Sequence, residues 1–202
     1  MPWRDRILSP GDSREEWLEA RRGRIGASDA GKFARAASVE KYVRAKLTPG
    51  FNGNVATESG NRWEPVLLAW AGFEQNLALI HHPDEPGFAA TPDGIDEAGG
   101  VLRLAEIKAK HRQILDGPKP HEVRQMAFQL FVVPEAVSVS YVWGELVPDP
   151  SEPDGWRLRR DPQTVVFHRD DPQIVAATEL IVPIAHKVLA ALTAAQQIES
   201  PF

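Results

Sequence analysis

Apolar and polar residues alternate from Leu102 to Lys108, and this period of two is typical of a β-strand. Glu106 and Lys108 would project to one side together with Leu102 and Leu104, opposite Arg103, Ala105 and Ile107. We expect Gly87–Thr91 to be the partner strand, joined through a turn at Gly99–Gly100. That pairing would bring Asp93 to a strand end near Glu106.

Two segments show helical spacing instead. Glu64 opens a stretch whose apolar residues recur at helical intervals, namely Val66, Leu67, Trp70 and Phe73. Residues 121–131 form an amphipathic pattern with an inward set of Val123, Met126, Ala127, Leu130 and Phe131. Gln125 and Gln129 are four positions apart, so they are expected to point the same way.

The two ends of the chain complete the expected elements. Ser28 or Asp29 would cap a helix that begins near Ala30, and for Ser28 capping and ligand contact stay equally open. Alternation predicts further strands at Ser138–Trp143, Trp156–Arg160 and Thr164–His168, which would extend the sheet. After Asp170 and Asp171, a last helix carries an apolar stripe; we expect it to pack across the sheet, with a subunit contact as the alternative.

Composition places the chain in a broad class. With 202 residues and 43% hydrophobic residues, it is expected to form one globular domain. The sequence shows no apolar run that we expect to span a bilayer and no signal sequence, so we expect a cytosolic location. The absence of cysteine excludes disulfides, thiolate nucleophiles and zinc–sulfur sites. None of the six histidines has ligand spacing, so we assign no metal to them.

Charge is distributed unevenly. The net charge is −5, yet residues 1–50 hold eleven Lys or Arg against seven Asp or Glu, a net of +4. A basic N-terminal segment suits contact with nucleic-acid phosphates, and a solvated helix face stays an alternative for residues 41–46.

Asp93, Glu106 and Lys108 carry the candidate chemistry. Hard cations such as Mg²⁺ take carboxylate and carbonyl oxygens, and a nearby ammonium can orient or deprotonate the attacking water. Taken alone the spacing is common, and a surface hairpin with solvated charges is then the favoured interpretation.

Four motifs occur in a specific order. They are Gly60-x-x-x-Glu64-Pro65, Thr91-Pro92-Asp93-Gly94, Glu106-Ile107-Lys108 and Gln125-x-x-x-Gln129. Upstream, Trp17 to Ser28 adds an opening motif with Arg21, in which Gly26 replaces the usual threonine. From about residue 14 to residue 133, the chain resembles the YqaJ-like viral recombinase nucleases, the lambda exonuclease family within the PD-(D/E)XK superfamily.

The resemblance implies an α/β fold with a restriction-endonuclease-like core, a mixed central β-sheet flanked by helices. The whole of residues 1–202 would be a single nuclease domain: residues 1–50 binding DNA ends, 58–133 carrying the catalytic motifs, and 134–202 extending the sheet and ending in a helix. The lack of cysteine excludes the iron–sulfur branch of the superfamily.

The resemblance also implies roles for individual residues. Two Mg²⁺ or Mn²⁺ ions would be held. Asp93, Glu106 and the Ile107 carbonyl would bind the first, and Glu64 would bind the second ion or the water shell of that ion. Lys108 would position and activate water, and Gln125 would hold that water or the lysine. A terminal 5′-phosphate would bind Arg21 and Ser28, and the DNA backbone would contact Arg22, Arg24, Lys32 and Arg35.

The implied activity is 5′ to 3′ degradation of one strand of duplex DNA. It would leave a 3′ single strand for an annealing protein, in the cytoplasm of a bacterial host, and the enzyme would be a ring-shaped trimer. Two other functions stay open. One is a sequence- or structure-selective endonuclease on the same core, which would need base-reading loops. The other is a non-catalytic DNA-binding accessory protein of recombination.

Overall fold

The computed structural model describes the backbone of residues 1–48 and 55–199 and the side chains of residues 1–48 and 62–195. Side chains of the Gly60-Asn61 part of the expected motif lie outside this range. The helical elements are η1 (Trp3–Arg6), α1 (Arg14–Arg21), α2 (Ala27–Ala30), η2 (Ala36–Ser38), α3 (Val39–Leu47), α4 (Val55–Ala71), α5 (Pro120–Val132) and α6 (Pro172–Glu199). The strands are β1 (Ile7–Ser9), β2 (Ile25–Gly26), β3 (Glu74–Gln75), β4 (Leu79–His81), β5 (Phe88–Ala90), β6 (Gly94–Ala98), β7 (Val101–His111), β8 (Ala136–Pro148), β9 (Trp156–Leu158) and β10 (Gln163–His168).

The strands form two mixed sheets. The larger has the order β10-β8-β7-β6-β3, with β9 also paired to β8; β7 and β8 run parallel and its other pairs antiparallel. The smaller has the order β1-β4-β5-β2, in which β2 and β5 are parallel. A mixed α/β fold with helices flanking the larger sheet is therefore confirmed, and the second sheet is an addition to the expectation.

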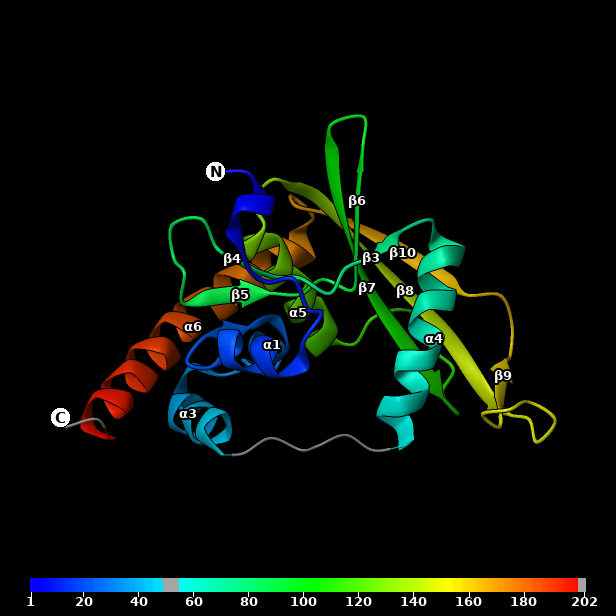
Figure 1. The fold of residues 1–202 in the computed structure, drawn as a ribbon, viewed down its shortest axis with the longest axis horizontal. Helices are drawn as coiled ribbons and strands as arrows, with labels where there is room; N and C mark the ends of the chain where they lie inside the picture. The colour runs from blue at the N-terminus through cyan, green and yellow to red at the C-terminus, as the bar shows by residue number, and fades with distance from the viewer. Residues whose placement is uncertain (49–54, 200–202) are drawn as a thin grey trace.

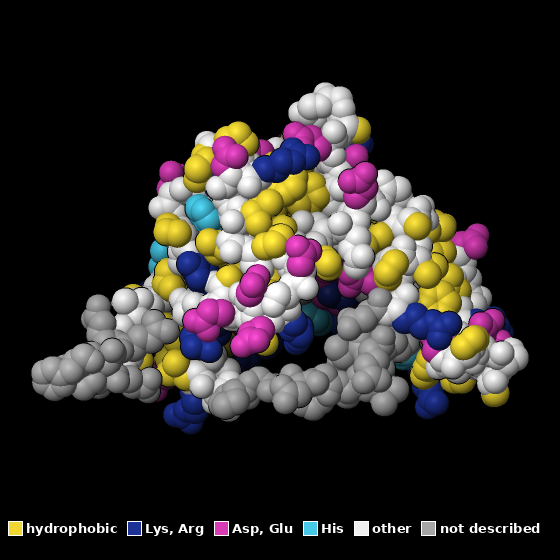
Figure 2. All heavy atoms as spheres, viewed as in Figure 1, with side chains coloured by type: hydrophobic (Ala, Val, Ile, Leu, Met, Phe, Trp, Pro, Cys, Tyr) yellow, Lys and Arg dark blue, Asp and Glu magenta, His cyan; other side chains and the backbone are white. Residues whose placement is uncertain are grey.

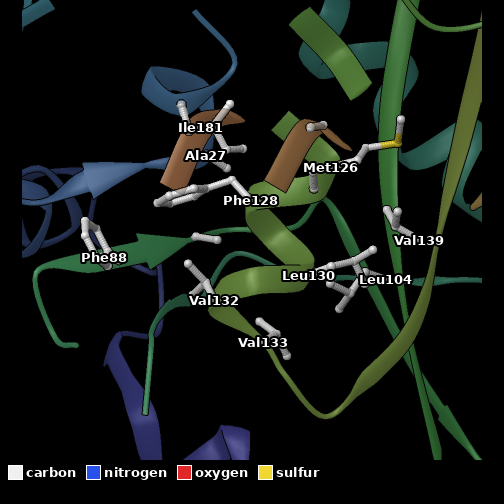
Figure 3. Close-up of a cluster of buried hydrophobic side chains, with 14 of the residues drawn as sticks. Ala27, Phe88, Leu104, Met126, Phe128, Leu130, Val132, Val133, Val139 and Ile181 are labelled. Carbon is white, nitrogen blue, oxygen red and sulfur yellow. The ribbon is translucent and has the colours of Figure 1, made fainter. Parts of the chain in front are cut away.

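Helices cover both faces of the larger sheet (Figure 1). On one face, α5 packs its buried residues into the main core against β7, β8, β5 and α6, and Figure 3 shows Met126, Phe128 and Leu130 of α5 there. On the other face, α4 buries Leu67 and Leu68 against Ala105, Ile107 and Val142. The alternating faces of β7 are thus buried against different helices, as its period of two requires.

The interior face of α4 differs from the expected one. Val66 and Trp70 are about half exposed, at 48% and 47%, whereas Leu67 and Leu68 are buried. The helix ends at Ala71, so Phe73 lies beyond it and reaches the same small core from the following loop. The spacing correctly predicted a helix. It did not predict the buried face, because the helix has more apolar residues than one face can bury.

The partner expected for the central strand was wrong. Residues 88–90 form β5 in the smaller sheet, and β7 pairs instead with β6, which directly precedes the Gly99–Gly100 turn. Both turn glycines have positive φ, 62° and 76°, and Ala98 faces Val101, so the hairpin closes over two residues. Such a tight turn leaves no room for a partner further upstream.

The long C-terminal helix packs differently from the expectation too. The stripe of Ile174, Ile181 and Val188 is buried as expected, but α6 lies mainly against α5 and α3 and touches the smaller sheet at β2 and β5. Within the described residues, Pro172–Ala195 is long and apolar enough to cross a membrane by length and composition alone, with a mean hydropathy of 1.7. A core helix passes the same test, and the buried stripe suits that role.

Candidate active site

Backbone hydrogen bonds fix Asp93 beside the central strand. The Asp93 N–H donates to the Ala105 carbonyl at 3.0 Å, and the Asp93 carbonyl accepts from the Asn76 N–H at 2.9 Å. Its carboxylate accepts from the Ile107 N–H, with Oδ2 2.7 Å from the nitrogen. The expected proximity of Asp93 to the Glu106–Lys108 motif is therefore present, although it arises from the β6–β7 pairing.

Glycine allows close packing next to this aspartate. A Cβ on Gly94 would lie 2.6 Å from Leu68 Cδ2 and 3.1 Å from the Ala105 Cβ. An added side chain would therefore force Leu68 to shift within the small core. The missing side chain therefore lets α4, which carries Glu64, pack closely on the hairpin.

Glu106 is fully buried and each of its carboxylate oxygens is hydrogen-bonded. Gln125 Nε2 donates to Oε1 at 2.7 Å, and Gln129 Nε2 donates to Oε2 at 2.6 Å. Lys108 forms an ion pair with the same Oε1. The four-residue spacing of the glutamines on α5 thus places both amides on one carboxylate, in agreement with the expected common direction.

The site carries an excess of negative charge. Burial raises the pKa of Asp93 well above its usual range, and the Glu106 carboxylate raises it further, while Lys108 acts in the opposite direction. Burial also raises the pKa of Glu64, an effect that the hydrogen bond from Gln75 Nε2 at 3.0 Å partly offsets. When all are ionised, these three carboxylates and one lysine sum to −2.

Lys108 is held in its charged form. Burial lowers its pKa, but Glu106 and Asp93 outweigh burial, so the net shift is upward. A protonated ammonium donates hydrogen bonds and offsets negative charge, but it does not accept a proton. In the arrangement described, Lys108 can therefore orient a water or a phosphate oxygen.

The donor set fits a hard divalent cation in its chemistry. Among the side chains that the structure describes, no three Asp, Glu or His side chains converge closely enough to enclose an ion. Mg²⁺ does not need such an enclosure, because it keeps several waters and binds through one or two carboxylates and substrate phosphates. Asp93 and Glu106 provide that pair, and a divalent cation would balance the −2 charge of the cluster.

A cleft joins the acids to the N-terminal motif. It encloses about 310 Å³ and is lined by Glu64, Gln75 and Asp93 on one side and by Arg14 and Trp17 of α1 on the other. Across it, Trp17 Nε1 donates to Thr91 Oγ1 at 3.2 Å, which ties the helix to the segment before Asp93. This volume lies within the usual range of small-ligand sites.

The structure brings Arg21 and Ser28 together. Arg21 Nη2 donates to Ser28 Oγ at 2.6 Å, and its guanidinium carbon lies 5.0 Å from the centre of the Trp17 ring. Ser28 does not cap the following helix, as one interpretation had it, because α2 begins at Ala27 with Gly26 before it. The capping contact is made by Asp29, whose Oδ2 accepts from the Gly26 N–H at 2.9 Å. The Ser28 side chain therefore faces outward beside an arginine.

The four residues expected to contact the DNA backbone have different surroundings. Arg22 is exposed and pairs with Glu19 at 2.9 Å, and Arg24 donates to the Pro86 carbonyl at 3.0 Å and to the Ala20 carbonyl. Lys32 and Arg35 are exposed. Figure 2 shows Asp and Glu side chains gathered over α1 on the face displayed, where the helix carries Glu15, Glu16 and Glu19. The expected positive surface is therefore not continuous on this face.

Two ion pairs near the site were not assigned from the sequence. Glu122 of α5 is buried and pairs with Lys110 of β7, one alternation beyond Lys108. Both could have been found, because Lys110 continues the period of two and Glu122 is one helical turn before Gln125. Asp29 and Lys46 form the second pair at 2.7 Å, and no sequence spacing connects them, because they lie on different helices.

Solved structures share this mixed α/β fold. The chain is similar to an alkaline exonuclease (LHK-Exo) from Laribacter hongkongensis, with a TM-score of 0.61, 23% identity, and coverage of 93% of this chain and 98% of that one. It is also similar to a phage-related exonuclease from Haemophilus somnus 129PT, with a TM-score of 0.56, 15% identity, and coverage of 95% and 93%.

A third similar structure is SOX in a complex with DNA, with a TM-score of 0.54, 10% identity, and coverage of 87% of this chain and 66% of that one. No family model and no curated protein matches the sequence. At these identities the likeness is one of fold. The expected lambda-exonuclease-like fold is confirmed.

Proposed function

We propose that this protein is a metal-dependent exonuclease that hydrolyses one strand of duplex DNA from its ends. The observation that carries the proposal is the position of the Asp93 carboxylate, held 2.7 Å from the Ile107 nitrogen beside the Glu106–Lys108 pair. Its support is the fold shared with two exonucleases and with SOX, which is found in a complex with DNA.

Asp93, Glu106 and the Ile107 carbonyl would hold one Mg²⁺ or Mn²⁺ ion, and Glu64 would serve a second ion through its water shell. When bound, a divalent cation acidifies the attacking water and offsets charge on the phosphate. Glu106 stays in place because Gln125 and Gln129 hold its two oxygens. Gln125 and Lys108 both contact Glu106 Oε1. Gln125 would therefore position the water indirectly, by holding Glu106 and Lys108 in place.

Lys108 would orient the attacking water. Its ammonium is charged, so it donates hydrogen bonds to the water and to the phosphate oxygens that gain charge in the transition state. The proton of the water leaves to bulk solvent or to a substrate oxygen.

Recognition of the DNA end would involve Arg21 and Ser28. A guanidinium beside a hydroxyl is a good receptor for a terminal 5′-phosphate, because charge-assisted hydrogen bonds are short and strong. Binding that end would set a 5′ to 3′ direction and leave a 3′ single strand for an annealing partner. We further propose that the protein forms a ring-shaped trimer and acts in the cytoplasm of a bacterial host.

The proposal is tested with purified protein, end-labelled linear duplex DNA and a choice of cations. We expect hydrolysis with Mg²⁺ or Mn²⁺, binding without turnover in Ca²⁺, which takes more ligands at longer distances, and no hydrolysis in EDTA. Glu106→Ala and Lys108→Ala should abolish turnover, while Glu64→Ala should leave residual activity because water can replace an outer ligand. Undiminished hydrolysis in excess EDTA would contradict the mechanism.

A further inference from the structure

Two cationic side chains contact the carboxylate of Asp29, and a third lines the same pocket. Lys46 Nζ lies 2.7 Å from Asp29 Oδ2, and Arg21 Nη2 lies 3.5 Å from the same oxygen. The third, Lys32, is close enough to Lys46 to lower its pKa, as Arg21 also does. The four side chains together carry a net charge of +2, and Asp29 contacts two of the three cations.

This cluster is sheltered from solvent but not closed. The side chains of Lys46 and Asp29 are 17% and 19% exposed, and that of Arg21 is 25% exposed. Burial and the two neighbouring cations lower the pKa of Lys46, and Asp29 opposes them. Burial raises the pKa of Asp29, but Lys46 and Arg21 bring it below its usual value. A buried ion pair is by itself weak support for a purely stabilising role, because desolvation offsets much of its attraction.

The outward side of the cluster is the Arg21–Ser28 contact. Ser28 is exposed, and its hydroxyl accepts from the same Arg21 nitrogen that approaches Asp29. A ligand that binds Arg21 and Ser28 therefore meets the positive field of Lys46 as well. A phosphate monoester carries about −1.5 to −2 charges at neutral pH, whereas an internal phosphodiester carries one.

We infer that Lys46 is a second cation for the terminal 5′-phosphate and gives the site its selectivity for a phosphate monoester over a diester or a hydroxyl. Asp29 is the positioning residue, since its one oxygen holds Lys46, Arg21 and the Gly26 N–H when no DNA is bound. The inference rests on the proposed binding of a DNA end at Arg21 and Ser28.

The test compares the rates of hydrolysis of linear duplexes with 5′-phosphate and 5′-hydroxyl ends. We expect Lys46→Met to reduce the phosphate preference about tenfold or more, and Lys46→Arg to retain part of it. The matched control is Lys187→Met, which removes an exposed lysine of α6 and should leave the preference unchanged. An equal slowing of both duplexes by Lys46→Met would overturn the inference, because it would indicate a structural role.

A measurement on the wild-type protein covers the case in which Lys46→Met does not fold. Lysine acetylation read by mass spectrometry should show Lys46 protected by the 5′-phosphate duplex more than by the 5′-hydroxyl duplex, with Lys187 unaffected. Equal protection overturns the inference. If Arg21→Ala removes the end preference and Lys46→Met does not, only the inference fails. If the wild-type protein has no end preference, the proposed end recognition fails with it.

Discussion

Asp93 shows at the scale of one residue how a site residue can oppose the stability of its own fold. Burial and Glu106 raise its pKa, so its charged form costs the folded protein free energy at neutral pH. The usual Asp contributes stability above its unfolded pKa, and here the sign is reversed because the folded pKa is the higher one. Charge that the protein alone does not balance is typical of functional sites.

We therefore predict that Asp93→Asn raises the Tm in metal-free buffer while it lowers nuclease activity by at least about a hundredfold. The amide keeps an oxygen for the Ile107 N–H but has no charge for a cation. Asp96→Asn is the matched control on β6, the strand that follows Asp93: it breaks the 2.5 Å pair with Arg103 and should leave activity near normal. A variant that is both active and less stable than wild type would refute this account of Asp93.

Periodicity alone indicated most side chains at the centre of the site. The period of two placed Glu106 and Lys108 together, and the four-residue spacing placed Gln125 and Gln129 together. The contact between Asp29 and Lys46 could not be obtained this way, because the short helix α2 and the packing of α3 bring it about. The roles of all these residues in DNA binding and hydrolysis stay predictions.

At the scale of elements, the error over Gly87–Thr91 has a physical cause. A short apolar run with a glycine pair downstream is compatible with several pairings, and only the tight Gly99–Gly100 turn selects Gly94–Ala98 as the partner. Helix α5 and strand β10 were located to within one residue at each end because their apolar residues recur regularly, whereas β8 extends beyond the expected Ser138–Trp143 at both ends. The apolar stripe of α6 predicts which face of the helix is buried, but it does not predict that α5 is the element that covers this face.

The β6–β7 hairpin gives the first prediction at this scale. Gly94→Ala should lower both stability and activity, because the added Cβ would meet Leu68 and displace the strand that follows Asp93. Gly144→Ala is the control: its Cβ would come within 2.9 Å of Leu67 in the same small core, away from Asp93. Specific activity should fall for the first variant only, measured per folded molecule beside thermal unfolding.

The contact between α5 and β7 leads to a second prediction, which concerns the stability of the fold. Glu122 is buried with Lys110, and its Oε2 accepts from the Tyr141 hydroxyl at 2.8 Å and the Lys119 N–H at 2.7 Å. Glu122→Ala should reduce the free energy of unfolding by about 3–5 kcal/mol, because it leaves the Lys110 charge buried. Glu179→Ala, an exposed position on α6, should change it by less than about 0.5 kcal/mol.

The pH dependence of that loss follows from the Glu122 pKa. Burial alone would raise it, but Lys110, the Lys119 N–H and Tyr141 bring it below the usual 4.5. A carboxylate with a lowered folded pKa contributes stability above its unfolded pKa, and this contribution is lost as the pH falls through the folded value. Denaturant unfolding should therefore show the difference between Glu122→Ala and wild type narrowing below pH 4.5. A constant difference down to pH 2 would contradict the assignment.

The whole molecule joins two sheets around a cleft, and its net charge is −5. Such a protein does not gain affinity for DNA from its total charge, so binding must depend on local positive charge. The sum of +2 around Asp29 and the exposed Ser28 beside Arg21 provide such a location near the cleft. The proposed nuclease should therefore act on ends, where a phosphate monoester is available.

Action at DNA ends is tested most directly with one wild-type preparation, Mg²⁺ and two DNA forms of equal sequence. One is a linear duplex with a 5′-phosphate and a label on either end, and the other is a covalently closed circle. We predict that the linear duplex is degraded with early release of the 5′ label, and that the circle stays intact. Cleavage of the circle at a rate comparable to that of the linear duplex would contradict it and favour an endonuclease.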